Sequence, residues 1–199
     1  MLDEPFRRWM HRRAAAPARG LHRLGATPDQ VTIAGALLGL LAAVVIARGA
    51  LVAGILVWIA GRVLDGYDGI LARVSGRTTL FGGFLDITLD MFAYSAMAIG
   101  FAIAMPDDRT LWLFVLFGYV MAITTTLALS SLLERADREL GGDRSLQFTA
   151  APAEGGETTI VYVLIALLPD WSRPVLAVWL LLLAATFLHR MFLAAKLLR

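Results

Sequence analysis

VTIAGALLGLLAAVVIA, residues 31–47, is a run of seventeen residues without a charged side chain. It follows Thr27, Pro28 and Asp29. Thr27 is typical of a helix N-cap, and Pro28 is typical of the first helical position. A helix needs about 20 mostly apolar residues to cross the hydrocarbon core of a bilayer. Together with its polar first turn the run reaches that length, so we expect a membrane-spanning helix here.

Five more apolar segments follow, separated by short polar turns or loops. One of them, 158–168, is short for a crossing and must include polar residues from Pro152 onward. The other four are expected at 51–64, continuing into a charged stretch, and at 80–105, 111–133 and 174–193. The sequence therefore predicts an all-α, polytopic membrane protein whose six transmembrane helices form one domain, residues 27–199.

The composition agrees with a chain embedded in lipid. Of the 199 residues, 58% are hydrophobic and 17% are charged, and the mean hydropathy is +0.70. A soluble domain carries about 25% charged residues, which argues against a water-soluble globule. Cysteine is absent, so disulfides, thiolate metal sites and cysteine nucleophiles are excluded. Lys196 is the single lysine in the sequence, which in practice excludes a P-loop or Schiff-base lysine.

Residues 1–26 are basic and amphipathic. Six arginines fall within the first 23 residues, among apolar side chains such as Phe6, Trp9 and Leu21. This pattern is typical of a helix that lies in the membrane interface and is attracted to anionic lipid rather than to nucleic acid. A signal peptide is the alternative, but the basic stretch is long for one and no convincing small-residue cleavage site follows the apolar run.

The distribution of cations predicts the orientation of the chain. With the N-terminus in the cytoplasm, the three outer turns contain only Arg48, Arg109 and Arg173. The other 15 of the 18 cations then fall on the cytoplasmic side, counting Arg62 near that end of its helix. Because Lys and Arg concentrate in cytoplasmic loops, we expect an integral protein of the inner or plasma membrane with both termini in the cytoplasm.

Four carboxylates interrupt the apolar pattern between residues 65 and 90. Asp65 and Asp68 are three residues apart, and Asp86 and Asp90 are four apart, so each pair shares one face of a helix. Ionised carboxylates next to hydrocarbon are costly and repel one another. Arg73 alone cannot neutralise four of them, whereas divalent cations can. All-oxygen ligands favour Mg²⁺ or Mn²⁺, with Ca²⁺ as a competitor.

Two other interpretations of these carboxylates compete. Asp65 or Asp68 could cap a helix end at the interface, but Asp86 and Asp90 lie further into an apolar helix. The carboxylates could also form the ion pathway of a divalent-cation transporter. Transporters often contain paired halves with matching broken helices, and the chain shows no such pairing. Because intramembrane carboxylates are functional by default, we interpret them as part of a site.

The complete pattern is Asp65-x-x-Asp68-Gly69-x-x-Ala72-Arg73, eight residues, Gly82, three residues, Asp86, three residues, Asp90. It resembles the signature of the CDP-alcohol phosphotransferase (CDP-alcohol phosphatidyltransferase) family at every position. Eight specified residues at fixed spacing make a strong motif. The chain length, the amphipathic start, the six spans and the Thr-Pro-Asp opening of the first span resemble the family as well.

The resemblance implies two divalent ions, Mg²⁺ or Mn²⁺, bound by Asp65, Asp68, Asp86 and Asp90, with Asp90 also acting as general base. It implies a nucleotide site made of Asp29, Gln30, Val31, Thr32, Asp65, Asp68, Gly69, Ala72, Arg73 and Thr79. The chemistry agrees, because metal ions can clamp the negative charge of a diphosphate. A glycine at position 69 also lets the backbone approach a ligand closely.

The implied reaction moves a phosphatidyl group from a CDP-lipid, usually CDP-diacylglycerol, to the hydroxyl of a small alcohol and releases CMP on the cytoplasmic side. Transfer of a phospho-alcohol from a soluble CDP-alcohol to diacylglycerol uses the same motif and is the alternative. Family members that take phosphorylated acceptors, such as inositol phosphate, often place two arginines where this chain has Gly155, Gly156 and Thr158. We therefore expect an acceptor without a phosphate. Dimerisation is common in the family, so the resemblance also implies a homodimer.

Overall fold

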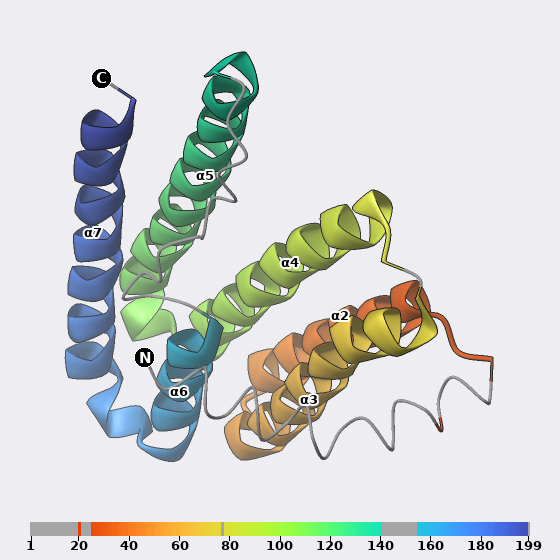
Figure 1. Cartoon of the computed structure of the whole chain (residues 1–199). Coiled ribbons are helices and arrows are strands. Elements are labelled where there is room, and N and C mark those ends of the chain that lie inside the picture. The colour runs from red at the N-terminus through yellow and green to blue at the C-terminus, as the bar shows by residue number, and fades with distance from the viewer. Residues whose placement is uncertain (1–19, 21–24, 77, 141–154, 199) are drawn as a thin grey trace. The chain divides into compact units, whose positions relative to one another are not determined.

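The computed structural model describes residues 20, 25–76, 78–140 and 155–198 (Figure 1). Among these residues the structure is all-helical, which confirms the predicted fold class. The interfacial helix predicted for residues 1–26 lies almost entirely outside the described residues. The helices are α2 (Pro28–Ala47), α3 (Leu51–Ser75), α4 (Leu80–Ala104), α5 (Arg109–Leu140), α6 (Gly155–Leu167) and α7 (Ser172–Leu197), with the short 3-10 helices η1 (Pro106–Asp108) and η2 (Pro169–Trp171).

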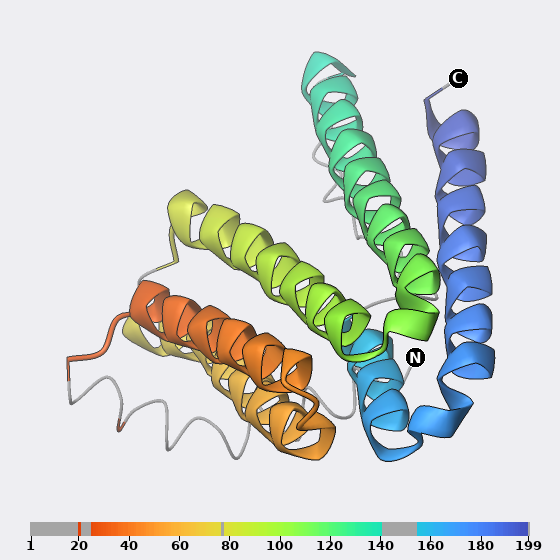
Figure 2. The ribbon, with the colours of Figure 1, turned by 180° about the vertical axis from the view of Figure 1, so that it is seen from behind.

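The chain divides into two compact units, residues 1–106 and residues 107–199. The first unit contains α2, α3 and α4, and α2 packs against both of the others. In Figure 2 α2 lies in front of α3 and next to α4. The second unit contains α5, α6 and α7. That residues 27–199 form a single domain stays a prediction.

Two local features organise the first unit: a capping box at the start of α2, and a close backbone contact between α2 and α4. A capping box begins α2: the Thr27 hydroxyl accepts a hydrogen bond from the Gln30 amide at 3.3 Å, and the Gln30 side chain accepts one from the Thr27 amide at 3.0 Å. Further along, a Cβ atom at Gly100 of α4 would lie 2.5 Å from the Ala43 carbonyl oxygen of α2. Only glycine fits such a contact, and small residues at helix interfaces are typical of membrane proteins.

A short turn between α3 and α4 brings the ends of three helices together. Gly76 follows α3 with a φ of 65°, the left-handed conformation that favours glycine at a helix C-terminus. Thr79 then caps α4, because its hydroxyl accepts a hydrogen bond from the Gly82 amide at 2.9 Å. The C-terminal part of α3 and the first turns of α4 therefore lie beside the start of α2.

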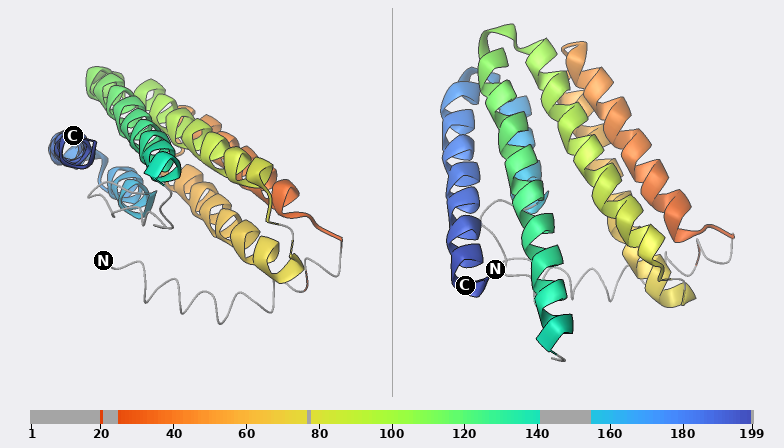
Figure 3. Two further views of the ribbon diagram at one scale, coloured as in Figure 1. Left: turned by 45° about the horizontal axis from the view of Figure 1, so that its top comes forward. Right: turned by 90° about the horizontal axis from the view of Figure 1, so that it is seen from above.

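Several polar side chains of the second unit are paired within it. The buried carboxylate of Asp108 accepts hydrogen bonds from Arg173 Nε at 2.8 Å and from the Ser172 hydroxyl. The hydroxyl oxygens of Tyr119 and Tyr162 are 3.0 Å apart in the interior. Polar groups in apolar surroundings need hydrogen-bond partners of this kind. Helices α5 and α7 pack side by side, as Figure 3 shows.

Within the part of the chain that the structure describes, four helical segments are long and apolar enough to cross a membrane: Pro28–Ala47, Leu80–Ala104, Pro106–Arg135 and Pro169–Leu197. Helix α3 has 25 residues but carries charged side chains in its second half, and α6 has 13 residues. Helices therefore occur at all six predicted positions, while a total of six crossings stays a prediction. Many large apolar side chains of these helices are exposed on the surface, as expected for contact with lipid.

Candidate active site

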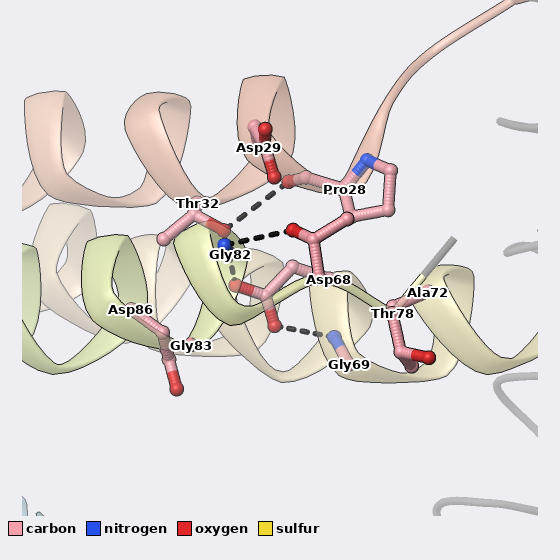
Figure 4. Close-up of a pocket in the computed structure, with 11 residues that line it drawn as sticks. Pro28, Asp29, Thr32, Asp68, Gly69, Ala72, Thr78, Gly82, Gly83 and Asp86 are labelled. Carbon is pink, nitrogen blue, oxygen red and sulfur yellow. Dashed lines mark hydrogen bonds between the residues drawn. The ribbon is translucent and has the colours of Figure 1, made fainter.

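A pocket of about 220 Å³ lies where the start of α2, the end of α3 and the start of α4 meet (Figure 4). Each of these helices contributes lining residues, and Thr78 and Thr79 just before α4 line the pocket as well. The lining residues are Pro28, Asp29, Thr32, Asp68, Gly69, Ala72, Thr78, Thr79, Gly82, Gly83 and Asp86. The pocket therefore combines two carboxylates of the sequence motif with small residues that leave room for a ligand.

Three carboxylates of the motif converge beside this pocket. One oxygen atom each from Asp65, Asp68 and Asp86 lies within 4.8 Å of the other two. Asp65 and Asp68 belong to α3, and Asp86 to α4, so the packing of both helices against α2 assembles the group. A set of carboxylate oxygens on partly buried helices fits a hard divalent cation such as Mg²⁺ or Mn²⁺. We call these three residues the carboxylate cluster.

Neighbouring groups fix the orientation of Asp68. The Thr32 hydroxyl of α2 donates a hydrogen bond to Asp68 Oδ2, with an oxygen–oxygen distance of 2.5 Å. The Gly69 amide donates to the other carboxylate oxygen. Thr32 is buried, with 4% of its surface exposed, so water does not readily replace its hydroxyl. Outer partners of this kind orient metal ligands and tune their affinity.

Asp90 lies one helical turn beyond Asp86 but has a different partner. Its Oδ1 atom accepts a hydrogen bond from Arg62 Nη1, and the same Nη1 atom lies 3.4 Å from Asp65 Oδ2. Asp90 is not a member of the carboxylate cluster. From the sequence, Arg62 is expected only as a charge near the cytoplasmic end of its helix, because local spacing does not indicate a contact with a residue 28 positions away.

The structure brings part of the expected nucleotide site together. Six of the ten residues line the pocket: Asp29, Thr32, Asp68, Gly69, Ala72 and Thr79. Gln30 and Val31 do not, because Gln30 caps the start of α2 and Val31 is buried against neighbouring helices. Asp65 lies in the carboxylate cluster, and Arg73 Nη2 would lie 3.8 Å from a Cβ atom at Gly69.

Four further lining residues were not among the expected nucleotide-binding residues: Pro28, Thr78, Gly82 and Gly83. Gly82 belongs to the motif, and its position shows why a small residue is needed there. A Cβ atom at Gly82 would lie 3.1 Å from Thr79 Oγ1 and 3.4 Å from Asp29 Oδ1. The N-cap of α4, Thr79, and the first-turn residue Asp29 of α2 thus meet at this glycine, which the motif alone could not show.

The segment expected to face the acceptor lies in the second unit. Gly155, Gly156 and Glu157 form the exposed first turn of α6, and Thr158 is buried behind them. Residues 153 and 154 lie outside the described residues. The acceptor expectation therefore stays a prediction.

Comparison with known proteins relates this chain to a group of lipid enzymes. It is 36% identical over 158 residues to the inner membrane protein YnjF of Escherichia coli, covering 77% of this chain and 75% of that protein. It is 32% identical over 179 residues to an archaetidylinositol phosphate synthase of Pyrococcus horikoshii, covering 88% and 87% of the two chains.

Solved structures of phosphatidylinositol phosphate synthase (PgsA1) of Mycobacterium tuberculosis share the fold. The structure with manganese and citrate matches with a TM-score of 0.67 and 28% identity, over 91% of this chain and 88% of that one. The structure with CDP-DAG bound matches with a TM-score of 0.64 and 29% identity, over 94% and 92%. The model of the CDP-alcohol phosphatidyltransferase family matches residues 26–191. This chain is therefore an integral membrane enzyme of the CDP-alcohol phosphatidyltransferase family.

Proposed function

We propose that this enzyme transfers a phosphatidyl group from a CDP-lipid, with CDP-diacylglycerol as the donor, to the hydroxyl of a small alcohol and releases CMP. The observation that carries the proposal is the convergence of Asp65, Asp68 and Asp86 beside a pocket lined by the expected nucleotide-binding residues. The related PgsA1 has been solved with CDP-DAG bound, which supports the lipid-linked donor. Family membership also argues against the cation-transporter alternative.

The carboxylate cluster together with Asp90 would hold the divalent ions, two of Mg²⁺ or Mn²⁺ as the motif implies. A manganese-containing structure of PgsA1 supports the use of such a metal. When bound, divalent ions supply charge neutralisation for a diphosphate and stabilise the leaving CMP. Thr32 and the Gly69 amide hold Asp68 in place for that role.

The remaining residues bind the donor and move one proton. Gly69 allows the backbone to approach the nucleotide, and the Arg73 guanidinium pairs with phosphate oxygens. Asp29 and Thr79 close the pocket from the first turns of α2 and α4. The acceptor hydroxyl attacks the lipid-side phosphorus, the bond from that phosphorus to CMP breaks, and Asp90 accepts the hydroxyl proton. A positioned general base of this kind contributes about 10²–10⁴-fold to the rate.

Two observations favour different classes of acceptor. Gly155, Gly156 and Thr158 stand where phosphate-binding arginines are expected in the family, which favours an acceptor without a phosphate. The names of the relatives favour a phosphorylated acceptor, because they include phosphatidylinositol phosphate and archaetidylinositol phosphate synthases. We propose a small polyol or amino alcohol without phosphate as the primary acceptor, with inositol phosphate as the second candidate.

The proposal includes the arrangement in the membrane. The pocket opens at the cytoplasmic ends of α2, α3 and α4, both termini are cytoplasmic, and the chain crosses the inner or plasma membrane six times. The basic residues 1–26 lie in the interface, and two copies form a homodimer. The cation distribution along the sequence supports this orientation.

The decisive experiment is an acceptor screen with protein purified in detergent. CDP-diacylglycerol, Mg²⁺ or Mn²⁺ and single acceptors are mixed, and released CMP and the lipid product are identified by mass spectrometry. We expect CMP release with one acceptor and none in EDTA. Full activity in EDTA, with metal removal verified, would contradict the proposed metal site. Product formation from a soluble CDP-alcohol and diacylglycerol, with none from CDP-diacylglycerol, would instead establish the alternative reaction.

A further inference from the structure

Two buried tyrosines connect α5 to α6 inside the second unit. The hydroxyl oxygens of Tyr119 on α5 and Tyr162 on α6 lie 3.0 Å apart, which is a hydrogen-bond distance. Tyr162 has no exposed surface, and Tyr119 is 8% exposed. A hydroxyl in apolar surroundings is costly without a partner, so this contact favours one position of α6 relative to α5. We call these two residues the tyrosine pair.

Neighbouring side chains on the same faces of α5 and α6 extend this contact. Thr158 lies one turn before Tyr162 on α6, so both side chains point to the same face. Thr158 is buried, and its side chain forms a hydrogen bond with that of Tyr119. On α5, Trp112 lies two turns before Tyr119, and its ring centre is 6.1 Å from the ring centre of Tyr162. One face of α5 therefore holds α6 at two levels.

The first turn of α6 has few side chains that could fix it. The helix begins with Gly155 and Gly156, and a Cβ atom at Gly156 would meet nothing within 4 Å. Glu157 is exposed, so Thr158 is the first buried residue of the helix. Further along, α6 packs against α7 and η2. The position of the first turn therefore depends on Thr158 and on the tyrosine pair that follows it.

We propose that Tyr119 and Tyr162 are positioning residues that fix the start of α6 and thereby set the affinity for the acceptor alcohol. This inference rests on the proposed function, and on the expectation that the start of α6 faces the acceptor. The pocket and the carboxylate cluster, which would hold the donor and the metal, are built from residues of the first unit. The tyrosine pair should therefore act on the acceptor and leave the donor unaffected.

Conservative variants test this role. Tyr119→Phe, Tyr162→Phe and the double variant remove hydroxyl groups and keep the aromatic rings. Thr158→Val removes the third hydroxyl and keeps the branched shape. Thr159→Val is the matched control, because the Thr159 hydroxyl donates at 3.0 Å to the Gly155 carbonyl of its own helix among the described contacts. Each purified protein is measured for kcat, for the KM of the acceptor and of CDP-diacylglycerol, and for thermal unfolding.

A second measurement does not depend on turnover. The sequence contains no cysteine, so a single Gly156→Cys substitution can carry a nitroxide spin label. The open space around this position accommodates the label without displacing a neighbour. The EPR line shape then reports the mobility of the first turn of α6. We expect the label to become more mobile when Tyr162→Phe is added, and to keep its mobility when Thr159→Val is added.

The kinetic expectation is a change in one KM only. Each tyrosine variant should raise the acceptor KM by about 2- to 10-fold, the factor that corresponds to one neutral hydrogen bond. The KM of CDP-diacylglycerol should stay within twofold of wild type. The double variant should be no worse than the product of the single effects, because both substitutions remove the same contact. Thr158→Val should resemble the tyrosine variants, and Thr159→Val should match wild type.

Other outcomes would overturn the proposal. An acceptor KM for Tyr162→Phe within twofold of Thr159→Val would show that the tyrosine pair does not set the affinity for the acceptor. Equal increases in both KM values, together with a lower melting temperature, would show that it contributes only to general stability. If wild-type protein releases no CMP with any acceptor, the proposed function fails. A spin label at position 156 whose mobility is unchanged by Tyr162→Phe would separately overturn the positioning of α6.

Discussion

Replacing Thr32 by valine should weaken metal binding without changing the fold. Valine has nearly the same shape as threonine, so the side chain still fills its buried position between α2 and α3. The substitution removes the hydroxyl that donates to Asp68 Oδ2 at 2.5 Å. Asp68 then keeps the Gly69 amide as a partner on the opposite oxygen and becomes free to rotate away from the carboxylate cluster.

The size of the effect follows from the kind of bond that is lost. A hydrogen bond to a charged acceptor contributes about 1.5–3 kcal/mol. Because Thr32 is only 4% exposed, water does not readily take over this bond. Losing an outer partner of a metal ligand typically lowers metal affinity by about 10- to 100-fold, and we expect a loss in this range for Mn²⁺.

The assay is Mn²⁺ titration of metal-free protein, followed by EPR of the free ion, together with the Mn²⁺ dependence of CMP release. Thr32→Ser retains a hydroxyl and should bind Mn²⁺ nearly as wild type does. Thr88→Val is the matched control, because the Thr88 hydroxyl bonds only to the Phe84 carbonyl of its own helix among the described contacts. If Thr32→Val binds Mn²⁺ within twofold of Thr88→Val, Asp68 does not depend on Thr32 and the reasoning is refuted.

Three further predictions concern the base, the packing and the topology. Asp90→Asn should still bind CDP-diacylglycerol but lose about 10²–10⁴-fold in CMP release; turnover within a few-fold of wild type would exclude Asp90 as the base. Gly100→Ala should lower the free energy of unfolding by about 1–3 kcal/mol, since its Cβ would lie 2.5 Å from the Ala43 carbonyl oxygen. Gly83→Ala is the control for thermal melting, because nothing lies within 4 Å of the added atom. Equal melting temperatures for Gly100→Ala and Gly83→Ala would contradict the packing argument. Single cysteines at Thr78 and Asp107 should react with impermeant reagents from opposite faces of the membrane, because α4 separates them. Labelling of both positions from the same face would contradict the six-span topology.

The sequence alone predicted which residues belong to the carboxylate motif and on which helices they lie. Spacings of three and four residues place side chains on one helical face, so the pairing of Asp65 with Asp68 is a local property of the chain. The helix start at Thr27 and Pro28 is local as well, because capping depends on neighbouring residues. The same holds for the apolar length of α2, and for this reason these features could be predicted without tertiary structure.

The expected run of nucleotide-binding residues shows where local reasoning ends. Asp29 and Thr32 line the pocket, whereas Gln30 and Val31 between them do not. Successive residues of a helix point about 100° apart, so the side chains of a contiguous run of four point in different directions. A part for Gln30 and Val31 in nucleotide binding stays a prediction. The helical period follows from the sequence, but the sequence does not show which face of α2 packs against α3 and α4.

Only the tertiary structure shows which of the four motif carboxylates contact one another and which one contacts an arginine. Arg62 and Asp90 are separated by 28 residues, and nothing in the sequence between them specifies that they meet. Their contact depends on how α3 and α4 each pack against α2. The packing of α4 on α2 depends in turn on close contacts such as that between Gly100 and Ala43. The sequence by itself determined a helical membrane enzyme with a recognisable carboxylate motif. Only packing determined which carboxylates face one another and which one faces a cation, because contacts between helices depend on the arrangement of whole faces rather than on local spacing.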